Sequence, residues 1–297
     1  MSKNKNPIFL GAATALITPF SGGSIDFESL GVLIDYQLNN SIDALVIAGT
    51  TGEASTLSED EYRDLISYSV LKIAGRVPVI VGSGSNDTAK SKKLTKIATD
   101  LGADACLVVT PYYNKATPRG LIESYKAIAD STDLPIIVYN VPTRTCVNIS
   151  LESYRELSKI ENVVAVKEAS PDIAACAELI FECGEDLDVY TGSDDQILPT
   201  LAIGGAGTIS VASNIIPGEI HEMCRSYLGG NTAQSRKLFK KYYKLLRSMF
   251  CEVNPIPVKT ALSMLGICRE EFRLPLCQIS DINRKRLEDI MRDLELI

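Results

Sequence analysis

The stretch VVAVKEAS, residues 163–170, places a lysine and a glutamate directly after four small apolar residues. Residues 163–166 show no alternation of polar and apolar side chains, which is typical of a strand covered on both faces, as in a parallel sheet. Burying an ammonium group at the end of such a strand is costly, so a lysine there usually leads the chain into solvent. Whether Lys167 is an exception depends on the fold around it.

Similar β-rich runs recur along the chain. Between them lie segments with apolar residues at three- and four-residue steps and with Ser, Asp or Thr near their starts, which predicts amphipathic helices. Strands that alternate with helices in this way indicate successive βα units, and eight such units close into a barrel. The eight runs are FLGAATALI (9–17), DALVIAG (43–49), VPVIVGS (77–83), ADACLVVTP (103–111), LPIIVYN (134–140), NVVAVKE (162–168), LDVYTGS (187–193) and GTISVAS (207–213).

The strand patterns stop after Ser213, and the rest of the chain alternates helical patterns with Gly and Pro. The sequence therefore predicts an α/β fold, a (β/α)8 TIM barrel over residues 1–225, followed by an all-helical C-terminal extension over residues 226–297. An open, doubly wound sheet is the competing architecture. No GxGxxG follows the first strand to support it.

Composition limits the possible partners. The 297 residues are 45% hydrophobic and 23% charged, which suits one large core. The net charge of -7, with no basic cluster in the sequence, argues against nucleic acid as a partner. No apolar run is long enough to span a bilayer, and the first ten residues lack the apolar stretch of a signal peptide. We therefore expect a cytoplasmic protein with no membrane partner.

Metal and thiol chemistry have little support in the sequence. The eight cysteines are scattered without a CxxC motif, and a large intracellular protein usually keeps such thiols reduced. The single histidine, His221, lies in a helical pattern with no cysteine partner at ligand spacing. We therefore predict no zinc cluster, and a structural role for His221 rather than a Ser-His or Cys-His pair.

The residues that close the predicted strands are chemically active. The active site of such a barrel lies where its strands end, so these side chains are expected to meet at one mouth. A desolvated lysine has a lowered pKa and offers the neutral amine that attacks a ketone, while a phenol can move protons. Lys167 therefore suggests Schiff-base chemistry, with Tyr139 as the proton carrier. The GTTGE turn also exposes backbone N–H groups that can hold a small carboxylate.

Each of these mouth residues has a simpler explanation when taken alone. Tyr112 and Tyr113 could be aromatic residues of an interface, and Arg144 could be a surface ion-pair partner. Their joint occurrence at consecutive strand ends favours a site instead. The polar residues expected at the mouth are Lys167, Arg144, Thr50, Thr51, Tyr112, Tyr113 and Tyr139.

Six motifs together resemble the dihydrodipicolinate synthase family, within the wider superfamily of pyruvate-dependent lyases that includes N-acetylneuraminate lyase and keto-deoxy-sugar aldolases. The resemblance runs through nearly the whole chain. GTTGE and the spacing from YN to the lysine indicate the superfamily, and YNVPTRT is the more specific signal. The motifs are GTTGE (49–53), TPYYNK (110–115), YNVPTRT (139–145), VAVKEAS (164–170), TGSDD (191–195) and NPIPVK (254–259).

The resemblance implies catalytic roles for four residues. Lys167 would form an imine with pyruvate, and Tyr139 would transfer protons while the imine forms and is hydrolysed. Thr51 would link Tyr139 to Tyr113 in a proton relay. Tyr113 would reach into the site of a neighbouring subunit across a tight dimer interface, which would make the dimer catalytic.

The resemblance also implies a set of binding residues. Thr50 and Thr51 would hold the pyruvate carboxylate, and Gly192 and Ile209 would line the pocket through backbone groups. A guanidinium such as that of Arg144 can grip the carboxylate of a second substrate through two parallel hydrogen bonds. NPIPVK looks like a packing motif between barrel and extension, which leaves Asn254 and Lys259 outside the site.

The implied reaction is the condensation of pyruvate with aspartate 4-semialdehyde, the entry step to diaminopimelate and lysine. It is implied to need no metal, nucleotide or organic cofactor, and to take place in a homodimer or a dimer of dimers. Two alternatives stay open at this point. One is a sister aldolase acting on N-acetylneuraminate or a keto-deoxy sugar acid, and the other is a barrel that binds a keto acid without turning it over.

Feedback inhibition by lysine is a further point of comparison. Members of the family that respond to lysine bind it in a cleft at the tight dimer interface, and this sequence keeps Asn86 and Tyr112 of that pattern. Lys90 replaces an acidic residue, and Glu59 and Tyr62 replace histidines. A cation at position 90 would repel the ligand's ammonium group unless water or Glu59 screens it, so we expect weak or absent inhibition.

Overall fold

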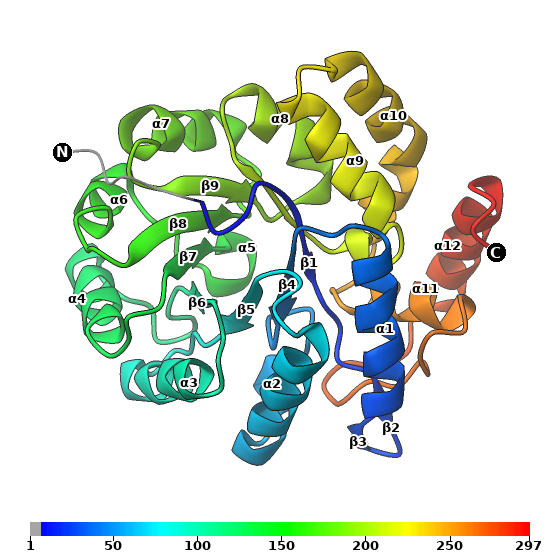
Figure 1. The fold of residues 1–297 in the computed structure, drawn as a ribbon, viewed down its shortest axis with the longest axis horizontal. Helices are drawn as coiled ribbons and strands as arrows, with labels where there is room; N and C mark the ends of the chain where they lie inside the picture. Colours follow the sequence, from blue (N-terminus) through cyan, green and yellow to red (C-terminus); the bar gives the residue numbers. More distant parts are fainter. Residues whose placement is uncertain (1–6) are drawn as a thin grey trace.

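A computed structural model describes residues 7–297, and the eight predicted runs form a closed parallel barrel (Figure 1). Each strand pairs with the next one along the chain, and the first pairs with the last. The predicted (β/α)8 architecture is thereby confirmed. The barrel strands are β1 (Gly11–Ala15), β4 (Ala44–Ile47), β5 (Val79–Gly82), β6 (Ala105–Val109), β7 (Ile136–Asn140), β8 (Val163–Glu168), β9 (Asp188–Thr191) and β10 (Gly207–Ser210).

Helices surround the barrel on the outside (Figure 1). A two-stranded hairpin, β2 (Phe20–Ser21) and β3 (Ser24–Ile25), follows the first strand, and the sequence pattern did not predict it. The helices between the strands and directly after the last one are α1 (Phe27–Asn39), α2 (Glu59–Ile73), α3 (Thr88–Asp100), α4 (Pro118–Ala129), α5 (Pro142–Thr145), α6 (Leu151–Leu157), α7 (Ile173–Cys183), α8 (Ile197–Ala202) and α9 (Pro217–Leu228).

Local side-chain caps fix where several of these helices begin. Ser58 and Glu61 form a reciprocal capping box at the start of α2, so each satisfies a backbone N–H that has no partner within the helix. Asp87 caps α3, and Asp172 caps α7 with one carboxylate oxygen that accepts from two N–H groups. The Ser, Asp and Thr residues that predicted these helices therefore have a direct physical role.

The interior of the barrel is filled by small and apolar side chains. Ile137, Ala165 and Ile209 belong to this inner cluster. Since side chains of a strand alternate between its faces, Tyr139 and Lys167, each two residues further along, also face the interior. The next residue of β8, Glu168, faces outward. Its carboxylate accepts hydrogen bonds there from Asn140, Tyr154 and the backbone N–H of Ser170.

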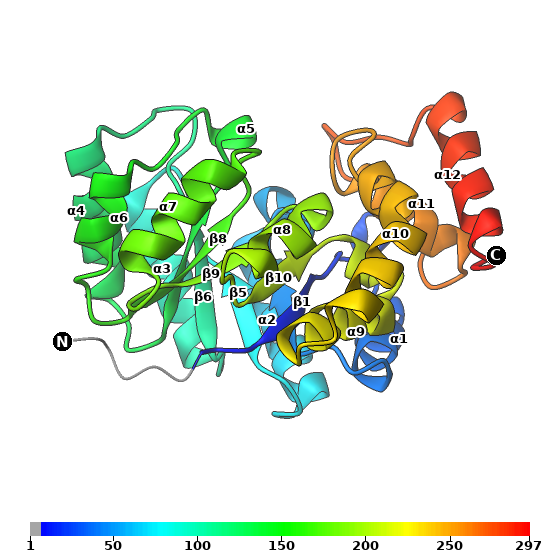
Figure 2. The same cartoon turned by 90° about the horizontal axis from the view of Figure 1, so that it is seen from above.

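The C-terminal part of the chain is helical, as predicted, with α10 (Thr232–Ser248), α11 (Ile256–Met264) and α12 (Asp281–Asp293). Helix α10 packs on α9, and Figure 2 shows α11 and α12 on the side of the molecule away from α4 and α6. The division after residue 225 falls inside α9 and stays a prediction.

No helix in residues 7–297 is both long enough and apolar enough to cross a bilayer. The cytoplasmic location stays a prediction.

Candidate active site

Strands β7 and β8 bring the two central predicted residues together. In the parallel register between them Tyr139 pairs with Lys167 and Asn140 pairs with Glu168. The Lys167 Nζ lies 4.6 Å from the centre of the Tyr139 ring. Both side chains are almost fully buried, at 5% and 7% exposure. The lysine that ends the apolar run is therefore not an exit into solvent but part of the barrel interior.

Lys167 lines a cavity of about 730 Å³, which we call the Lys167 chamber. Burial lowers the pKa of Lys167, the Asp194 carboxylate opposes this effect and the Arg144 guanidinium adds to it, which leaves the pKa at about 8. No carboxylate among the described residues forms an ion pair with this amine. The chamber is lined by residues that include Thr51, Tyr139, Arg144, Lys167, Gly192 and Asn254.

Gly192 has no side chain, and the Lys167 side chain occupies the space that one would fill. A Cβ atom at this position would lie 2.8 Å from the Lys167 Cε and 2.8 Å from the Ala169 Cβ. Real Cβ atoms do not approach other carbons so closely, so a side chain here would displace Lys167. Gly192 thus has a steric role at the predicted place on the chamber wall.

Asn254 connects two of the predicted residues. Its Nδ2 donates to the Thr51 hydroxyl at 2.9 Å, and its backbone carbonyl accepts from the Arg144 Nη2 at 2.9 Å. The side chain is 7% exposed, and its Oδ1 has no hydrogen-bond partner among the described residues. Asn254 therefore lines the chamber, contrary to the expectation that its motif serves packing alone.

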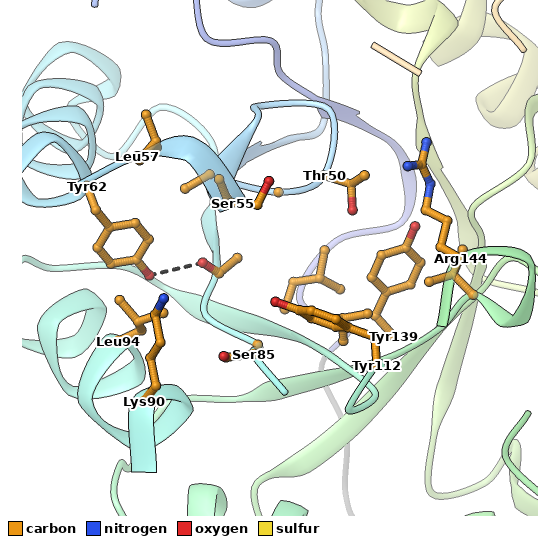
Figure 3. Close-up of a pocket in the computed structure, with 18 of the residues that line it drawn as sticks. Thr50, Ser55, Leu57, Tyr62, Ser85, Lys90, Leu94, Tyr112, Tyr139 and Arg144 are labelled. Atoms are coloured by element: carbon orange, nitrogen blue, oxygen red, sulfur yellow. Dashed lines mark hydrogen bonds between the residues drawn. The ribbon is translucent and has the colours of Figure 1, made fainter. Parts of the chain in front are cut away.

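Thr50 and Thr51 face different partners although they are adjacent in the chain. Figure 3 shows Thr50 and Arg144 on opposite sides of the Tyr139 phenol. Burial and Glu168 raise the pKa of Tyr139, whereas Arg144 and Thr50 lower it. Thr50 is thus the threonine beside the Tyr139 phenol, and Thr51 accepts a hydrogen bond from Asn254 instead.

A second cavity of about 500 Å³ adjoins the first at Tyr139, Val141 and Arg144. We call it the Lys90 chamber. Figure 3 shows Lys90 and Tyr62 at its far end, away from Tyr139 and Thr50. Its charged lining residues are Glu59, Lys90, Lys93 and Arg144.

Two predicted site residues lie outside both chambers. The Tyr113 side chain is 91% exposed, on a backbone with a φ of 69°. A positive φ is uncommon for a residue with a side chain, so the loop holds this phenol outward at some cost in free energy. Ile209 lies fully buried in the apolar interior of the barrel and not on a chamber wall.

Asp194, in the TGSDD motif, was not predicted as a site residue. It is fully buried, and its Oδ2 accepts hydrogen bonds from the N–H groups of Val211 and Ala212 at 3.1 and 2.9 Å. Burial raises its pKa to about 6, although the Ser210 hydroxyl and these N–H groups lower it. The sequence signal was available, since Asp194 follows a strand end in one of the quoted motifs.

Among residues 7–297 no group of three or more His, Cys, Asp and Glu side chains is placed to hold a metal ion. The expectation that no cofactor takes part stays a prediction.

The lowered pKa of Lys167 gives a testable pH dependence. Because only the neutral amine is acylated, trace labelling of Lys167 by acetic anhydride should rise with pH, reach half its maximum near pH 8, and level off above that. Exposed lysines in the same sample should keep rising toward a pKa of about 10.4. Peptide mass spectrometry of each lysine is the measurement, and a Lys167 midpoint that matches the exposed lysines would contradict the burial argument.

Comparisons with known proteins agree with this geometry. The Dihydrodipicolinate synthetase family matches residues 8–294. The 4-hydroxy-tetrahydrodipicolinate synthase of Alkaliphilus oremlandii is 50% identical over 290 residues, which cover 98% of this chain and 100% of that protein. The crystal structure of dihydrodipicolinate synthase from Aquifex aeolicus is 44% identical, has a TM-score of 0.95, and covers 97% of this chain and 99% of that one.

A third relative was solved with a ligand. The chloride-inhibited dihydrodipicolinate synthase of Acinetobacter baumannii, complexed with pyruvate, is 39% identical with a TM-score of 0.95, and the match covers 97% of this chain and 99% of that one. The resemblance found in the six motifs is confirmed: this chain belongs to the dihydrodipicolinate synthetase family.

Proposed function

We propose that this enzyme condenses pyruvate with L-aspartate 4-semialdehyde through an imine on Lys167, as a 4-hydroxy-tetrahydrodipicolinate synthase at the start of the diaminopimelate route to lysine. The observation that carries the proposal is a buried amine, with a pKa of about 8 and no ion-pair partner among the described residues, beside a buried phenol. Such an amine has a substantial neutral fraction near neutral pH, and the neutral form is the nucleophile.

The chemistry follows from that amine. The neutral Nζ of Lys167 attacks the keto carbon of pyruvate, and loss of water gives the imine, which is an electron sink. Loss of a methyl proton gives an enamine, and its carbon attacks the aldehyde of the second substrate. The amine of that substrate then attacks the imine carbon, closes the ring and releases Lys167. Each step needs a proton donor or acceptor close to the imine, and Tyr139 is in place for that role.

The roles that we assign to Thr50 and Thr51 differ from those expected from the sequence. Thr50 lies beside the Tyr139 phenol and lowers its pKa, so we assign the proton relay to Thr50 and not to Thr51. The N–H groups of both residues donate to no described residue, and they can therefore receive the pyruvate carboxylate. Thr51 stays in the binding role, with its hydroxyl oriented by Asn254.

Arg144 is suited to the carboxylate of the second substrate. It lines both chambers at the point where they meet, and among the described residues only its Nη2 has a hydrogen-bond partner, the carbonyl of Asn254. The remaining N–H donors of the guanidinium can form a charge-assisted pair with a carboxylate.

Self-association follows from the position of Tyr113. A phenol that is 91% exposed and held outward by the backbone contributes nothing to its own chamber. We assign it to the site of a second copy of this chain, in a homodimer or a dimer of dimers, where Tyr113 extends the relay from Thr50 and Tyr139. The catalytic unit is then the dimer.

Substitution of the nucleophile tests the proposal. Lys167→Ala should fold normally and lose condensation activity by on the order of a thousandfold or more, since no second residue offers a neutral amine in the chamber. The measurement is product formation from pyruvate and aspartate semialdehyde, with N-acetylneuraminate cleavage assayed in parallel. Wild-type turnover of the sugar acid in preference to the condensation would favour the sister aldolase, and no turnover of either would favour a keto-acid-binding barrel.

Matched substitutions separate the two threonines. Thr50→Val removes the hydroxyl that lowers the pKa of Tyr139, so kcat should fall by roughly 10- to 100-fold through slower proton transfer. Thr51→Val leaves Tyr139 untouched and should mainly raise the KM for pyruvate. Steady-state kinetics of both variants decide the matter: a larger loss of kcat in Thr51→Val than in Thr50→Val would return the relay to Thr51.

Removal of Arg144 tests the second-substrate assignment. Arg144→Ala should reduce kcat/KM for aspartate semialdehyde by about 10- to 100-fold, because a charged hydrogen bond in a partly exposed site is worth about 1.5 to 3 kcal/mol. Pyruvate labelling by borohydride should change far less. Arg247→Ala is the matched control, since this guanidinium lines the same chamber but is already paired with Asp195. Equal loss for both substrates in a folded Arg144→Ala protein would contradict the assignment.

The charges of the Lys90 chamber bear on inhibition by lysine. Glu59 forms ion pairs with Lys93 and Arg63, and these hydrogen bonds lower the pKa of its carboxyl. Glu59 is thus already neutralised and does not screen Lys90, which has no ion-pair partner among the described residues. We infer that an ammonium group is repelled there and that lysine does not inhibit this enzyme.

Initial rates at increasing lysine concentration test this inference. The wild type should be insensitive, and Lys90→Glu should become sensitive because the new carboxylate can pair with the ligand's ammonium group. Lys96→Glu, on the same helix but outside the chamber, is the control for added negative charge. Strong inhibition of the wild type would show that the charge argument is wrong.

A further inference from the structure

A buried ion pair joins the C-terminal extension to the turn that follows β4. Lys259 in α11 donates to the Glu53 Oε1, and the two side chains are 0% and 2% exposed. The same Nζ donates to the Glu271 carbonyl at 2.9 Å and lies 4.4 Å from the centre of the Phe20 ring. The pair is therefore fully enclosed, and it is not on the wall of either chamber.

Glu53 belongs to the same turn as the two threonines. Its backbone is left-handed, with φ 54° and ψ 35°, and its N–H donates to the Thr50 carbonyl at 3.1 Å. For a residue with a side chain this conformation is unfavourable and persists only where the surroundings impose it. The surroundings here are the contacts of its carboxylate, because the Glu53 Oε2 also accepts from the backbone N–H of Arg273 at 3.3 Å.

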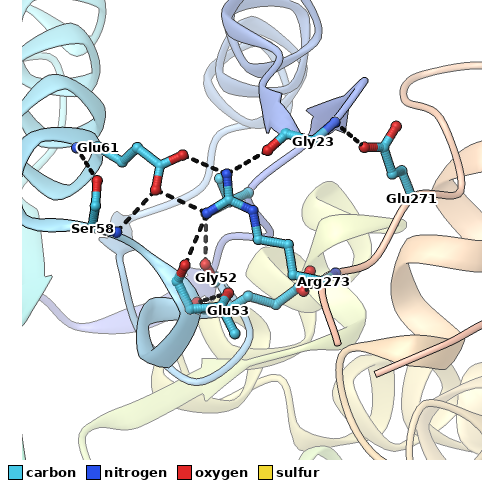
Figure 4. Close-up of polar contacts among 9 residues, drawn as sticks. Gly23, Gly52, Glu53, Ser58, Glu61, Glu271 and Arg273 are labelled. Carbon is cyan, nitrogen blue, oxygen red and sulfur yellow. Dashed lines mark hydrogen bonds and ion pairs between the residues drawn. The ribbon is translucent and has the colours of Figure 1, made fainter. Parts of the chain in front are cut away.

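The extension also contacts the segment that follows the turn. Arg273 Nη1 donates to the Thr56 carbonyl at 2.9 Å, and its guanidinium forms an ion pair with Glu61. Figure 4 shows the Arg273 guanidinium lying between Glu61 and Gly23, with Glu53 and Gly52 beside it. Together with the bond from Asn254 to Thr51, the extension thus holds the turn from both ends.

Net stability does not explain such a pair. Taking two charges out of water costs several kcal/mol per ion, and replacing a buried pair with apolar residues of similar volume is often neutral or stabilising. What a buried pair does supply is a fixed position. The carboxylate meets its partners in one place only, so the backbone that carries it is fixed as well. The segment fixed here presents the Thr50 and Thr51 N–H groups.

We propose that Glu53 and Lys259 are positioning residues for pyruvate: their ion pair fixes the Thr50–Thr51 turn in the geometry that receives the pyruvate carboxylate, so the C-terminal extension is a working part of the pyruvate site. The inference rests on the proposed binding role of the two threonines. It goes beyond that role because neither Glu53 nor Lys259 lines either chamber.

The double variant Glu53→Gln with Lys259→Met tests the proposal. It removes both charges together, so neither is left buried alone. The pyruvate concentration that gives half-maximal borohydride labelling of Lys167 should rise about tenfold or more, while the KM for aspartate semialdehyde changes less than about twofold. The midpoint of thermal unfolding should stay near that of the wild type. A folded double variant with unchanged half-saturation by pyruvate would overturn the proposal.

Two further variants keep the outcome decisive. Glu53→Asp retains both charges and shortens the tether by one methylene, so it serves if the double variant does not fold, with the same rise expected and the same unchanged result excluding the proposal. Glu270→Gln is the matched control, because Glu270 binds Arg284 within the extension without contacting the turn, and its half-saturation should equal the wild type.

Thr51→Val in the same labelling assay separates this inference from the proposed function. If Thr51→Val changes the half-saturation by pyruvate and the Glu53 variants do not, the positioning role alone is wrong. If neither changes it, the proposed binding role of the Thr51 side chain is wrong as well.

Discussion

The pairing of β7 with β8 is the constraint on which the site depends. It sets Tyr139 opposite Lys167 inside the barrel and Asn140 opposite Glu168 outside it. A slip of one residue would exchange the two faces, putting a carboxylate in the barrel interior and the amine among the helices. The outer contacts of Glu168 with Asn140 and Tyr154 oppose such a slip. The buried polar residues on the outside thus secure the geometry of the reactive ones on the inside.

Among residues 7–297 two lysines are buried, and their surroundings differ. Lys259 has Glu53, a carbonyl and two aromatic rings around its ammonium group, so its charge is satisfied and its position fixed. Lys167 lies against one aromatic ring with no ion pair among the described residues, and burial lowers its pKa to about 8. Depth alone therefore does not make a lysine reactive. Burial lowers the pKa of Lys259 as well, but its amine is held by Glu53, whereas the Lys167 amine has no paired carboxylate and lines a chamber that a substrate can enter.

The sequence predicted the barrel because every strand has its own apolar run and most of the helices between the strands begin at a side-chain cap, and both signals are local. It missed β2 and β3, whose two-residue strands are too short to show a pattern. The site was predicted as far as strand ends converge, which covers Lys167, Tyr139 and Gly192. Asn254 was not predicted because it reaches Thr51 from far along the chain, and strand ends alone do not tell which of Thr50 and Thr51 lies beside Tyr139.

We assign Lys167 as the nucleophile because, of the two lysines buried among residues 7–297, it is the one without an ion-pair partner. Incubation of the wild type with pyruvate and borohydride, followed by peptide mapping, tests this assignment most directly. We expect one reduced pyruvate adduct per chain, on the peptide that carries Lys167, with Lys259 unmodified. An adduct on another lysine, or none at pyruvate concentrations that support turnover, would contradict it.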